Sequence, residues 1–304
     1  PDYDFHISDI KIEEIPACEP ASVSATTNIT ATTVTINWSA SASNPADGYE
    51  WEVRNGETVA ASGTVSVGVL TADVTGLVPQ TSYTAWVRAN CGGGDFSEWV
   101  SGGAFTTTQI PVTLPYTDDF SANNFTFVNG SQTNRWAYGS ATGNTANSIY
   151  VSNNGGTSNA YNTSSTSVVH AYRDIEIPAG ETLVSLNFDW KCVGESGYDY
   201  IRVWLVPASF IPTAGTSITA AAGRIQVGGN LDSQNTWQTY SNNAVDVSSF
   251  AGTTMRLVFE WRNDFSGGSN PPGAIDNVFL GFSNTIWNGT AWSNGEPTST
   301  KSAV

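Results

Sequence analysis

Alternation of apolar and polar side chains is the sequence feature that most constrains the fold of this chain. The clearest alternating segments are residues 33–38, 83–88 and 200–205. Successive side chains of a β-strand point to opposite faces, so this pattern indicates half-buried strands. Clusters of Gly, Asn, Asp, Ser and Pro separate the strands, as at 43–48 and 266–273, and are typical of loops. No segment has a convincing helical period, and the sequence therefore predicts an all-β protein.

Length and charge narrow the class of protein further. The 304 residues are enough for about two domains. Lysine and arginine number 11 against 27 aspartates and glutamates, which gives a formal net charge of −16. Nucleic acids and anionic membranes are bound chiefly through clustered basic residues, so we expect no nucleic-acid partner. No run approaches the roughly 20 apolar residues of a membrane helix, and we expect no membrane insertion.

The first part of the chain, residues 16–108, holds about seven strands at the spacing of a β-sandwich of about 100 residues. The turn from Leu77 to Tyr83, followed by the long strand at 84–89, resembles the fibronectin type III pattern. Trp38 matches the buried tryptophan of an early strand in that family. The resemblance implies that the Tyr83 ring fills the edge of the core while its hydroxyl bonds to the backbone of the preceding turn.

The second part, residues 114–282, carries a different set of motifs. They are Leu114–Phe120, Leu257–Asp264 and Pro271–Val278. These motifs resemble the jelly-roll modules of the MAM-like, cleaved-adhesin and choice-of-anchor J group, which occur in secreted Bacteroidota proteins. The resemblance implies a second, larger jelly-roll β-sandwich and export by a type IX secretion system.

The two ends of the chain suggest a modular array. Residues 5–12 have the alternation of residues 273–280, so residues 1–15 are expected to be the closing strand of a preceding jelly roll; the alternative is an extra edge strand of the first sandwich. Residues 109–113 are expected to be a linker, and residues 283–304 the start of a following module. Neighbouring modules of the same protein are thus the first expected partners.

The cysteines are interpreted through the first resemblance. Cys18 and Cys91 lie where related Bacteroidota fibronectin-like modules have a disulfide, which implies that the two are bonded. Closing such a loop of about 70 residues stabilises by about 4 kcal/mol in the chain-entropy model. Cys192 has no obvious partner and is expected to be a buried thiol. Both expectations fit an oxidising compartment.

A structural calcium ion is implied by the second resemblance. Asp118 or Asp119 on the opening strand and Asp276 on the closing strand are expected to be neighbours, with Asp119 the expected ligand. Asn153 and Asn154 are expected to supply further oxygens, with Asn154 the expected ligand. Carboxylate, amide and carbonyl oxygens are the ligands that calcium prefers. The alternative is that Asp119 and Asp276 cap turns or pair with Arg262 or Arg173.

Catalysis is not expected from this sequence. Glu260, Asp264, Asp189 and Asp199 offer carboxylates for a glycosidase pair, but sequence spacing cannot set the distance that such a pair needs. The charges of Glu260 and Arg262 alternate with apolar residues, which predicts that both face away from the core on a strand.

Aromatic residues provide the remaining candidates for a site. Trp136, Trp237 and Tyr240 lie in polar, loop-like sequence and are expected to be exposed, where rings can stack on sugars. The sequence therefore supports two hypotheses. The preferred hypothesis is that the chain consists of non-catalytic adhesive or spacer modules of a large secreted or cell-surface bacterial protein. Its expected external partners are glycans or host and cell-surface proteins. The alternative is a carbohydrate-binding accessory region of a secreted hydrolase whose catalytic domain lies outside this chain.

Overall fold

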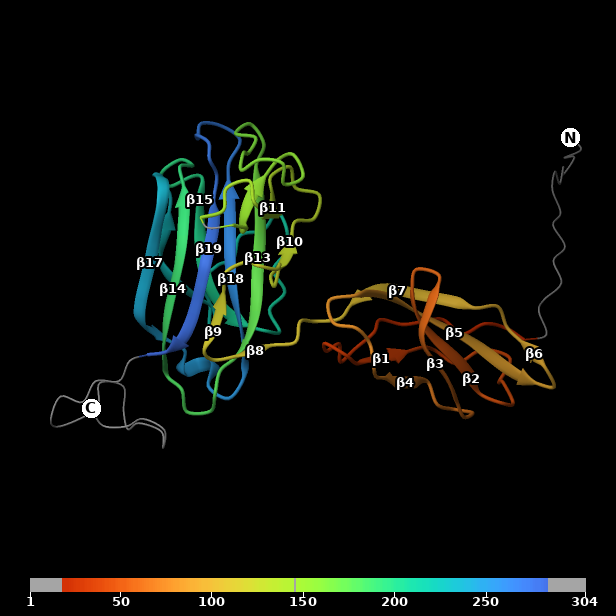
Figure 1. Ribbon diagram of the computed structural model, residues 1–304. Coiled ribbons are helices and arrows are strands. Elements are labelled where there is room, and N and C mark those ends of the chain that lie inside the picture. Colours follow the sequence, from red (N-terminus) through yellow and green to blue (C-terminus); the bar gives the residue numbers. More distant parts are fainter. Residues whose placement is uncertain (1–17, 145, 284–304) are drawn as a thin grey trace, which may run out of the picture. The chain divides into compact units, whose positions relative to one another are not determined.

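The structure, a computed structural model, describes residues 18–144 and 146–283, and it is nearly all strand. The all-β prediction is confirmed. A single turn of 3₁₀ helix at Ser248–Phe250 is the helical element of the described part of the chain. None of its helices is therefore long and apolar enough to span a bilayer. The chain divides into two compact units, residues 1–110 (unit 1) and 111–304 (unit 2) (Figure 1).

Unit 1 is a sandwich of two antiparallel sheets. One sheet pairs β1 with β4, and the other has the order β3-β2-β5-β6 with β7 also paired to β5. The strands are β1 (Val34–Asn37), β2 (Tyr49–Asn55), β3 (Thr58–Val65), β4 (Thr71–Val74), β5 (Ser82–Gly92), β6 (Asp95–Phe96) and β7 (Val100–Thr106). Alternate residues of β5 are buried, as the period-two pattern requires. This register places the core between the two sheets.

The core of unit 1 contains the residues that carried the fibronectin resemblance. Trp38 is buried and meets the ring of Tyr49 edge-on, with centroids 5.7 Å apart. The hydroxyl oxygen of Tyr83 accepts a hydrogen bond from the backbone N–H of Val78 at 3.0 Å. The expected tyrosine corner is therefore present, and it fixes the turn that leads into β5.

The expected Cys18–Cys91 disulfide is present in unit 1. The two Cα atoms are 5.9 Å apart, and the bond joins residues separated by 73 positions. Cys192, in unit 2, is a free and buried thiol, as expected. Burial raises the pKa of its thiol, so it is poorly suited to react as a thiolate.

Unit 2 is a larger sandwich of two mainly antiparallel sheets (Figure 1). Sheet A has the order β10-β13-β18-β15-β16 with β8 on β13, and sheet B has the order β11-β12-β19-β14-β17 with β9 on β19. The strands are β8 (Val112–Thr113), β9 (Tyr116–Asp118), β10 (Thr126–Val128), β11 (Arg135–Gly139), β12 (Ser148–Ser152), β13 (Ser167–Glu176), β14 (Leu183–Cys192), β15 (Tyr200–Pro207), β16 (Ile225–Leu231), β17 (Gln234–Asp246), β18 (Thr254–Asn263) and β19 (Ala274–Phe282).

One apolar core fills the space between sheets A and B. Alternate residues of β18 point into it, and the Phe259 ring lies 5.2 Å from the Phe188 ring of sheet B. The opposite face of sheet A is covered by residues 208–224. Ile218 from this segment packs with Trp204 and Val258 in a second, smaller cluster.

The covering segment buries charged groups on the outer face of sheet A. Glu260 faces away from the core, as predicted, but the covering segment buries it completely. Its carboxylate accepts a hydrogen bond from the Ile218 N–H of that segment at 2.5 Å. Arg256 forms a buried ion pair with Asp174 at 2.7 Å and donates to the Phe210 carbonyl at 2.8 Å. These bonds hold the segment against the sheet.

The structure changes one expected boundary. Residues 112 and 113 lie within the segment 109–113 that was expected to be a linker, yet they form β8 in parallel register with Ile175 and Glu176. Backbone hydrogen bonding to sheet A thus draws them into unit 2. The expectations for residues 1–15 and 284–304 concern residues outside the described part of the chain and remain predictions. Ser283 is described and donates its hydroxyl to the Asn243 carbonyl.

Candidate ligand-binding surfaces

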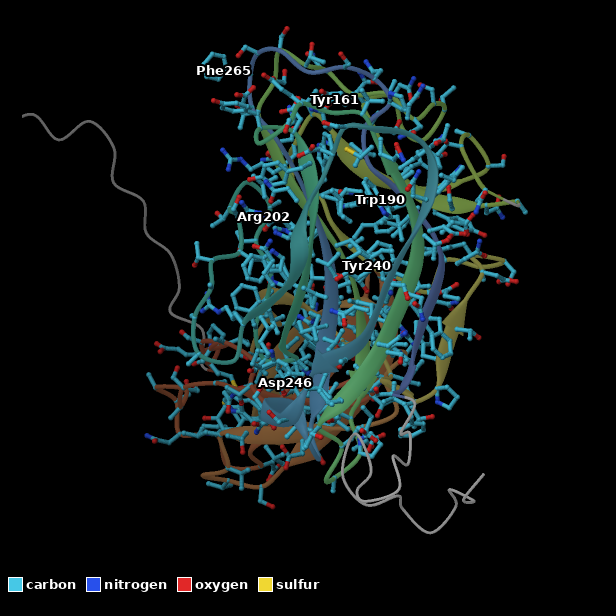
Figure 2. The ribbon with its side chains drawn as sticks, turned by 90° about the vertical axis from the view of Figure 1, so that its left-hand side faces the viewer. Tyr161, Trp190, Arg202, Tyr240, Asp246 and Phe265 are labelled. Carbon is cyan, nitrogen blue, oxygen red and sulfur yellow. A yellow bond between two sulfur atoms is a disulfide. The ribbon has the colours of Figure 1, made fainter. Side chains whose placement is uncertain are left out.

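The chain enters and leaves unit 2 at the same end. The opening strand β9 pairs with β19, with Tyr116 opposite Leu280, and the end of β19 lies opposite Val184 at the start of β14. We call this the proximal end. The loops 129–134, 153–166, 193–199 and 264–273 lie at the opposite, distal end. Figure 2 shows Phe265 and Tyr161 at this distal end and Asp246 at the other.

A groove of about 610 Å³ opens at the distal end. Its two walls come from residues 129–138, which lead into and along β11, and from residues 152–156, which follow β12. Gly155 and Gly156 have φ of 71° and 89°, a left-handed backbone that favours glycine. A Cβ on Gly156 would lie only 3.3 Å from the Ala137 Cβ, so glycine lets the two walls approach.

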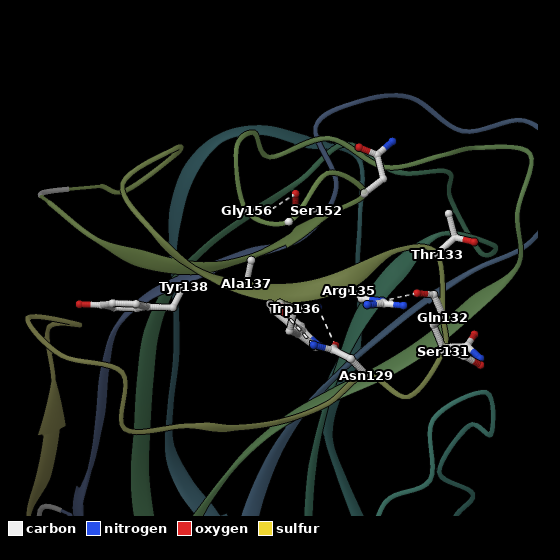
Figure 3. Close-up of a pocket in the computed structure, with 12 residues that line it drawn as sticks. Asn129, Ser131, Gln132, Thr133, Arg135, Trp136, Ala137, Tyr138, Ser152 and Gly156 are labelled. Carbon is white, nitrogen blue, oxygen red and sulfur yellow. Dashed lines mark hydrogen bonds between the residues drawn. The ribbon is translucent and has the colours of Figure 1, made fainter.

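Hydrogen bonds hold both walls of the groove in place (Figure 3). The Asn129 side chain accepts from the Trp136 N–H and donates to the Trp136 carbonyl, both at 2.9 Å. On the other wall, the Ser152 hydroxyl oxygen accepts from the Gly156 N–H at 3.0 Å. The shape of the groove is therefore set before any ligand arrives.

The chemistry of the groove is polar. Hydroxyl and amide side chains line it, including Ser131, Thr133 and Asn153. Arg135 is the one charged side chain among the lining residues, and its Nε donates to the Gln132 carbonyl at 2.5 Å (Figure 3). The groove is thus free of carboxylates in a chain that carries 27 of them, which makes its local charge opposite in sign to the net charge.

The distal end also carries a cluster of three carboxylates. Oxygens of Glu195, Asp199 and Asp264 lie within 4.8 Å of one another, with Asp199 buried. Asp199 accepts from the Tyr161 hydroxyl at 2.6 Å and from the Asp264 N–H at 3.0 Å. Burial first, and then the charges of Asp264 and Glu195, raise the pKa of Asp199. Burial and the bond to Asp199 likewise raise the pKa of Tyr161.

The residues expected to bind calcium have different surroundings. Asp119 is exposed and its carboxylate accepts from the Ser121 N–H at 2.9 Å, which lowers its pKa. Asp276 is completely buried and accepts from the Asn144 N–H at 2.9 Å. Asn154 bonds to Ser158 within its own loop. The expected pairing of opening and closing strands is observed, but it brings Asp118 opposite Val278 and leaves Asp119 as a turn cap.

The structure corrects one of the three expected stacking residues and places the other two half-buried on β17. Trp136 is not exposed: it lies on β11 with 2% of its surface accessible, because its indole points inward and donates to the Val169 carbonyl. Tyr240 lies on β17, and its ring stacks on Phe188 of the core at 4.9 Å. Trp237, also on β17, is half-buried beneath the Lys191 ammonium, 5.2 Å from the ring centre.

Sequence reasoning named Asp199 and Asp264 as candidate carboxylates but did not place them together with Glu195, and it did not identify the groove as a site. The groove and the carboxylate cluster are both assembled from loops that are far apart in the sequence, such as 129–135 with 152–156 and 193–199 with 264–273. The glycine pair 155–156 was the one local signal for the groove, since adjacent glycines mark close backbone approach.

Comparison with known proteins identifies unit 1. Residues 19–102 match the model of the fibronectin type III domain, and we assign them to that class. A fibronectin type III domain of human collagen XX is 19% identical, covering 32% of this chain and 100% of that chain with a TM-score of 0.26. The chain has no match among curated proteins.

Solved structures with similarity beyond unit 1 include carbohydrate-binding modules. One, from a study of modules of the β-sandwich superfamily, is 11% identical, covering 88% of this chain and 99% of that chain with a TM-score of 0.34. Another, TmCBM61 in complex with β-1,4-galactotriose, is 11% identical, covering 54% and 90% with a TM-score of 0.30. The MAM-like identification of unit 2 remains a prediction.

Proposed function

We propose that this chain is a non-catalytic adhesive segment of a secreted or cell-surface protein, in which unit 1 is a spacer and unit 2 is a binding head. The observation that carries the proposal is the path of the chain through each unit. A spacer passes the chain from end to end, whereas a head receives and returns it at one end and leaves the other end free.

Unit 1 has the path of a spacer. Cys18, which precedes the first strand of the unit, is bonded to Cys91 near the end of β5, and β7 ends at Thr106 opposite Ser82 at the start of β5. These two points are separated by the length of β5, or about 30 Å at 3.3 Å per residue. The disulfide ties the first of these points to the longest strand of the unit.

Unit 2 has the path of a head. Its opening strand and its closing strand meet at the proximal end, so all the distal loops are free of chain connections. Loops at one end of a rigid sandwich are a common place for binding residues, because the sheets fix the positions of the loops while the loop sequences vary. The groove lies at this end.

The surroundings of Glu260 and Asp189 favour binding over catalysis. Glu260 is sealed beneath residues 208–224. Asp189 accepts hydrogen bonds from Thr239, Asn144 and Asn277 on the surface of sheet B. A glycosidase needs two carboxyl groups facing a sugar across a site, and these two groups lie on different sheets.

The second candidate function is that of a carbohydrate-binding accessory region of a hydrolase, and the polar groove is the observation that favours it. The disulfide supports an oxidising, extracellular location for either function. Export by a type IX system and a structural calcium ion remain proposals that rest on the resemblance of unit 2 to secreted modules.

Oriented attachment of the full chain tests the adhesive proposal. A single biotin is placed on Ala179→Cys in the proximal loop or on Ser266→Cys in the distal loop, and the buried Cys192 leaves the label specific. Beads carrying each form are applied to surfaces coated with polysaccharides or matrix glycoproteins. We expect adhesion only with proximal attachment, and no release of soluble sugar. Adhesion that is equal in both orientations, or turnover of the coating, would contradict the proposal.

A further inference from the structure

We propose that the distal groove binds an oligosaccharide that carries a carboxylate, and that Arg135 recognises this carboxylate. The inference rests on the proposed function and specifies the ligand of the binding head. It follows from the charge of the groove, from the chemistry of its lining and from the rigidity of its walls.

The lining suits a ligand rich in hydroxyl groups. Ser131 and Thr133 hydroxyls, the Asn153 amide and the backbone at Gly155 offer donors and acceptors in similar measure, as a sugar does. Protein partners depend on buried aromatic and aliphatic anchors at the centre of an interface. Two aromatic residues line the groove, but the Trp136 ring is turned into the core and the Tyr138 hydroxyl donates to the Phe120 carbonyl at 3.1 Å. The groove of about 610 Å³ has the size of a site for a small ligand.

The charge of the groove selects an anionic sugar. Arg135 is exposed, and the bond from its Nε to the Gln132 carbonyl fixes the plane of its guanidinium. A guanidinium held in this way matches the geometry of a carboxylate better than an ammonium does.

The same features imply binding without cleavage. No carboxylate lies among the residues that line the groove, so neither a general acid nor a nucleophile is available to a glycosidic bond there. The walls are already held by the Asn129 and Ser152 hydrogen bonds, so little ordering of the protein is needed when the ligand binds.

The test is a glycan array in which neutral oligosaccharides are matched with counterparts that carry uronic or sialic acids, probed with the full chain. We expect carboxylated members to bind and their neutral counterparts to bind at least tenfold more weakly. Titration calorimetry on the strongest member then compares variants. Arg135→Ala should weaken binding by about 10- to 100-fold, and Arg135→Lys should restore it only in part.

Arg202→Ala is the matched control, because it removes the same charge from the outer face of sheet A, where Arg202 bonds to Asn230 outside the groove. It should bind as the wild type does. Binding that Arg135→Ala leaves unchanged, an equal response to neutral sugars, or an array without any bound glycan would overturn the inference. If the beads adhere only with proximal attachment but no glycan on the array is bound, this inference is wrong and the proposed function stands. If the beads do not adhere and no glycan is bound, the proposed function is wrong as well.

Discussion

Loss of the Cys18–Cys91 disulfide should destabilise unit 1 and leave unit 2 unchanged. The bond joins residues 73 positions apart, and closing a loop of that length in the unfolded chain corresponds to about 4 kcal/mol of stability. Cys18 belongs to the core of unit 1 and Cys91 packs against it, so the double variant Cys18→Ala/Cys91→Ala keeps a small apolar side chain at both positions and loses the two sulfur atoms with the bond. The expected loss of stability therefore comes mainly from the greater conformational entropy of the unfolded chain without the disulfide.

Differential scanning calorimetry of the full chain measures this loss. For a domain of about 90 residues, 1 kcal/mol corresponds to a shift of about 4 to 8 °C, so the unit 1 midpoint should fall by about 15 to 30 °C. Cys192→Ala is the control for cysteine removal and should affect only the unit 2 transition. A fall of less than about 5 °C in the unit 1 midpoint would refute the loop-closure reasoning.

Three further predictions concern the separate behaviour and the electrostatics of the units. The units should unfold in two separate calorimetric transitions, and residues 16–108 alone should reproduce the transition of unit 1. One shared transition in the full chain, with the isolated unit 1 unfolded, would contradict this prediction. Burial raises the pKa of Asp199 above its ordinary value, so its protonated form stabilises unit 2 at low pH and this stability is lost as the pH rises through the raised pKa. In denaturant titrations across that range, Asp199→Asn should gain stability over the wild type with rising pH, and a constant difference would disprove the assignment. If calcium binds through Asp119, Asn154 and Asp276, EDTA should lower the unit 2 midpoint and Asp276→Ala should abolish the effect; an unchanged wild-type midpoint and no ion in elemental analysis would exclude the ion.

Much of the fold could be predicted because its determinants are local. Alternation in β5 set its buried face, and the Leu77–Tyr83 turn identified a tyrosine corner whose hydrogen bond the structure shows. The disulfide followed from family resemblance, and the structure contains it. Each of these features depends on a short segment or on a motif with a fixed place in its fold.

The binding surfaces could not be predicted because they depend on contacts between distant segments. Trp136 has polar neighbours in the sequence, yet the Val169 carbonyl on another strand draws its indole inward. Glu260 alternates as a surface residue, but residues 208–224 fold over it. The groove itself exists only where the loop before β11 meets the loop after β12. Sequence alternation reports which face of a strand a residue occupies and not what covers that face.

The central claim is that unit 2 binds its ligand at the distal end. Hydrogen exchange of the full chain, followed by mass spectrometry with and without the strongest carboxylated oligosaccharide, tests it most directly. We predict slower exchange in residues 129–138 and 152–156 on addition of the sugar, and no change in the proximal loop 178–182 or in unit 1. Slower exchange at the proximal loop or on the sheets of unit 1, with the groove unchanged, would contradict the account.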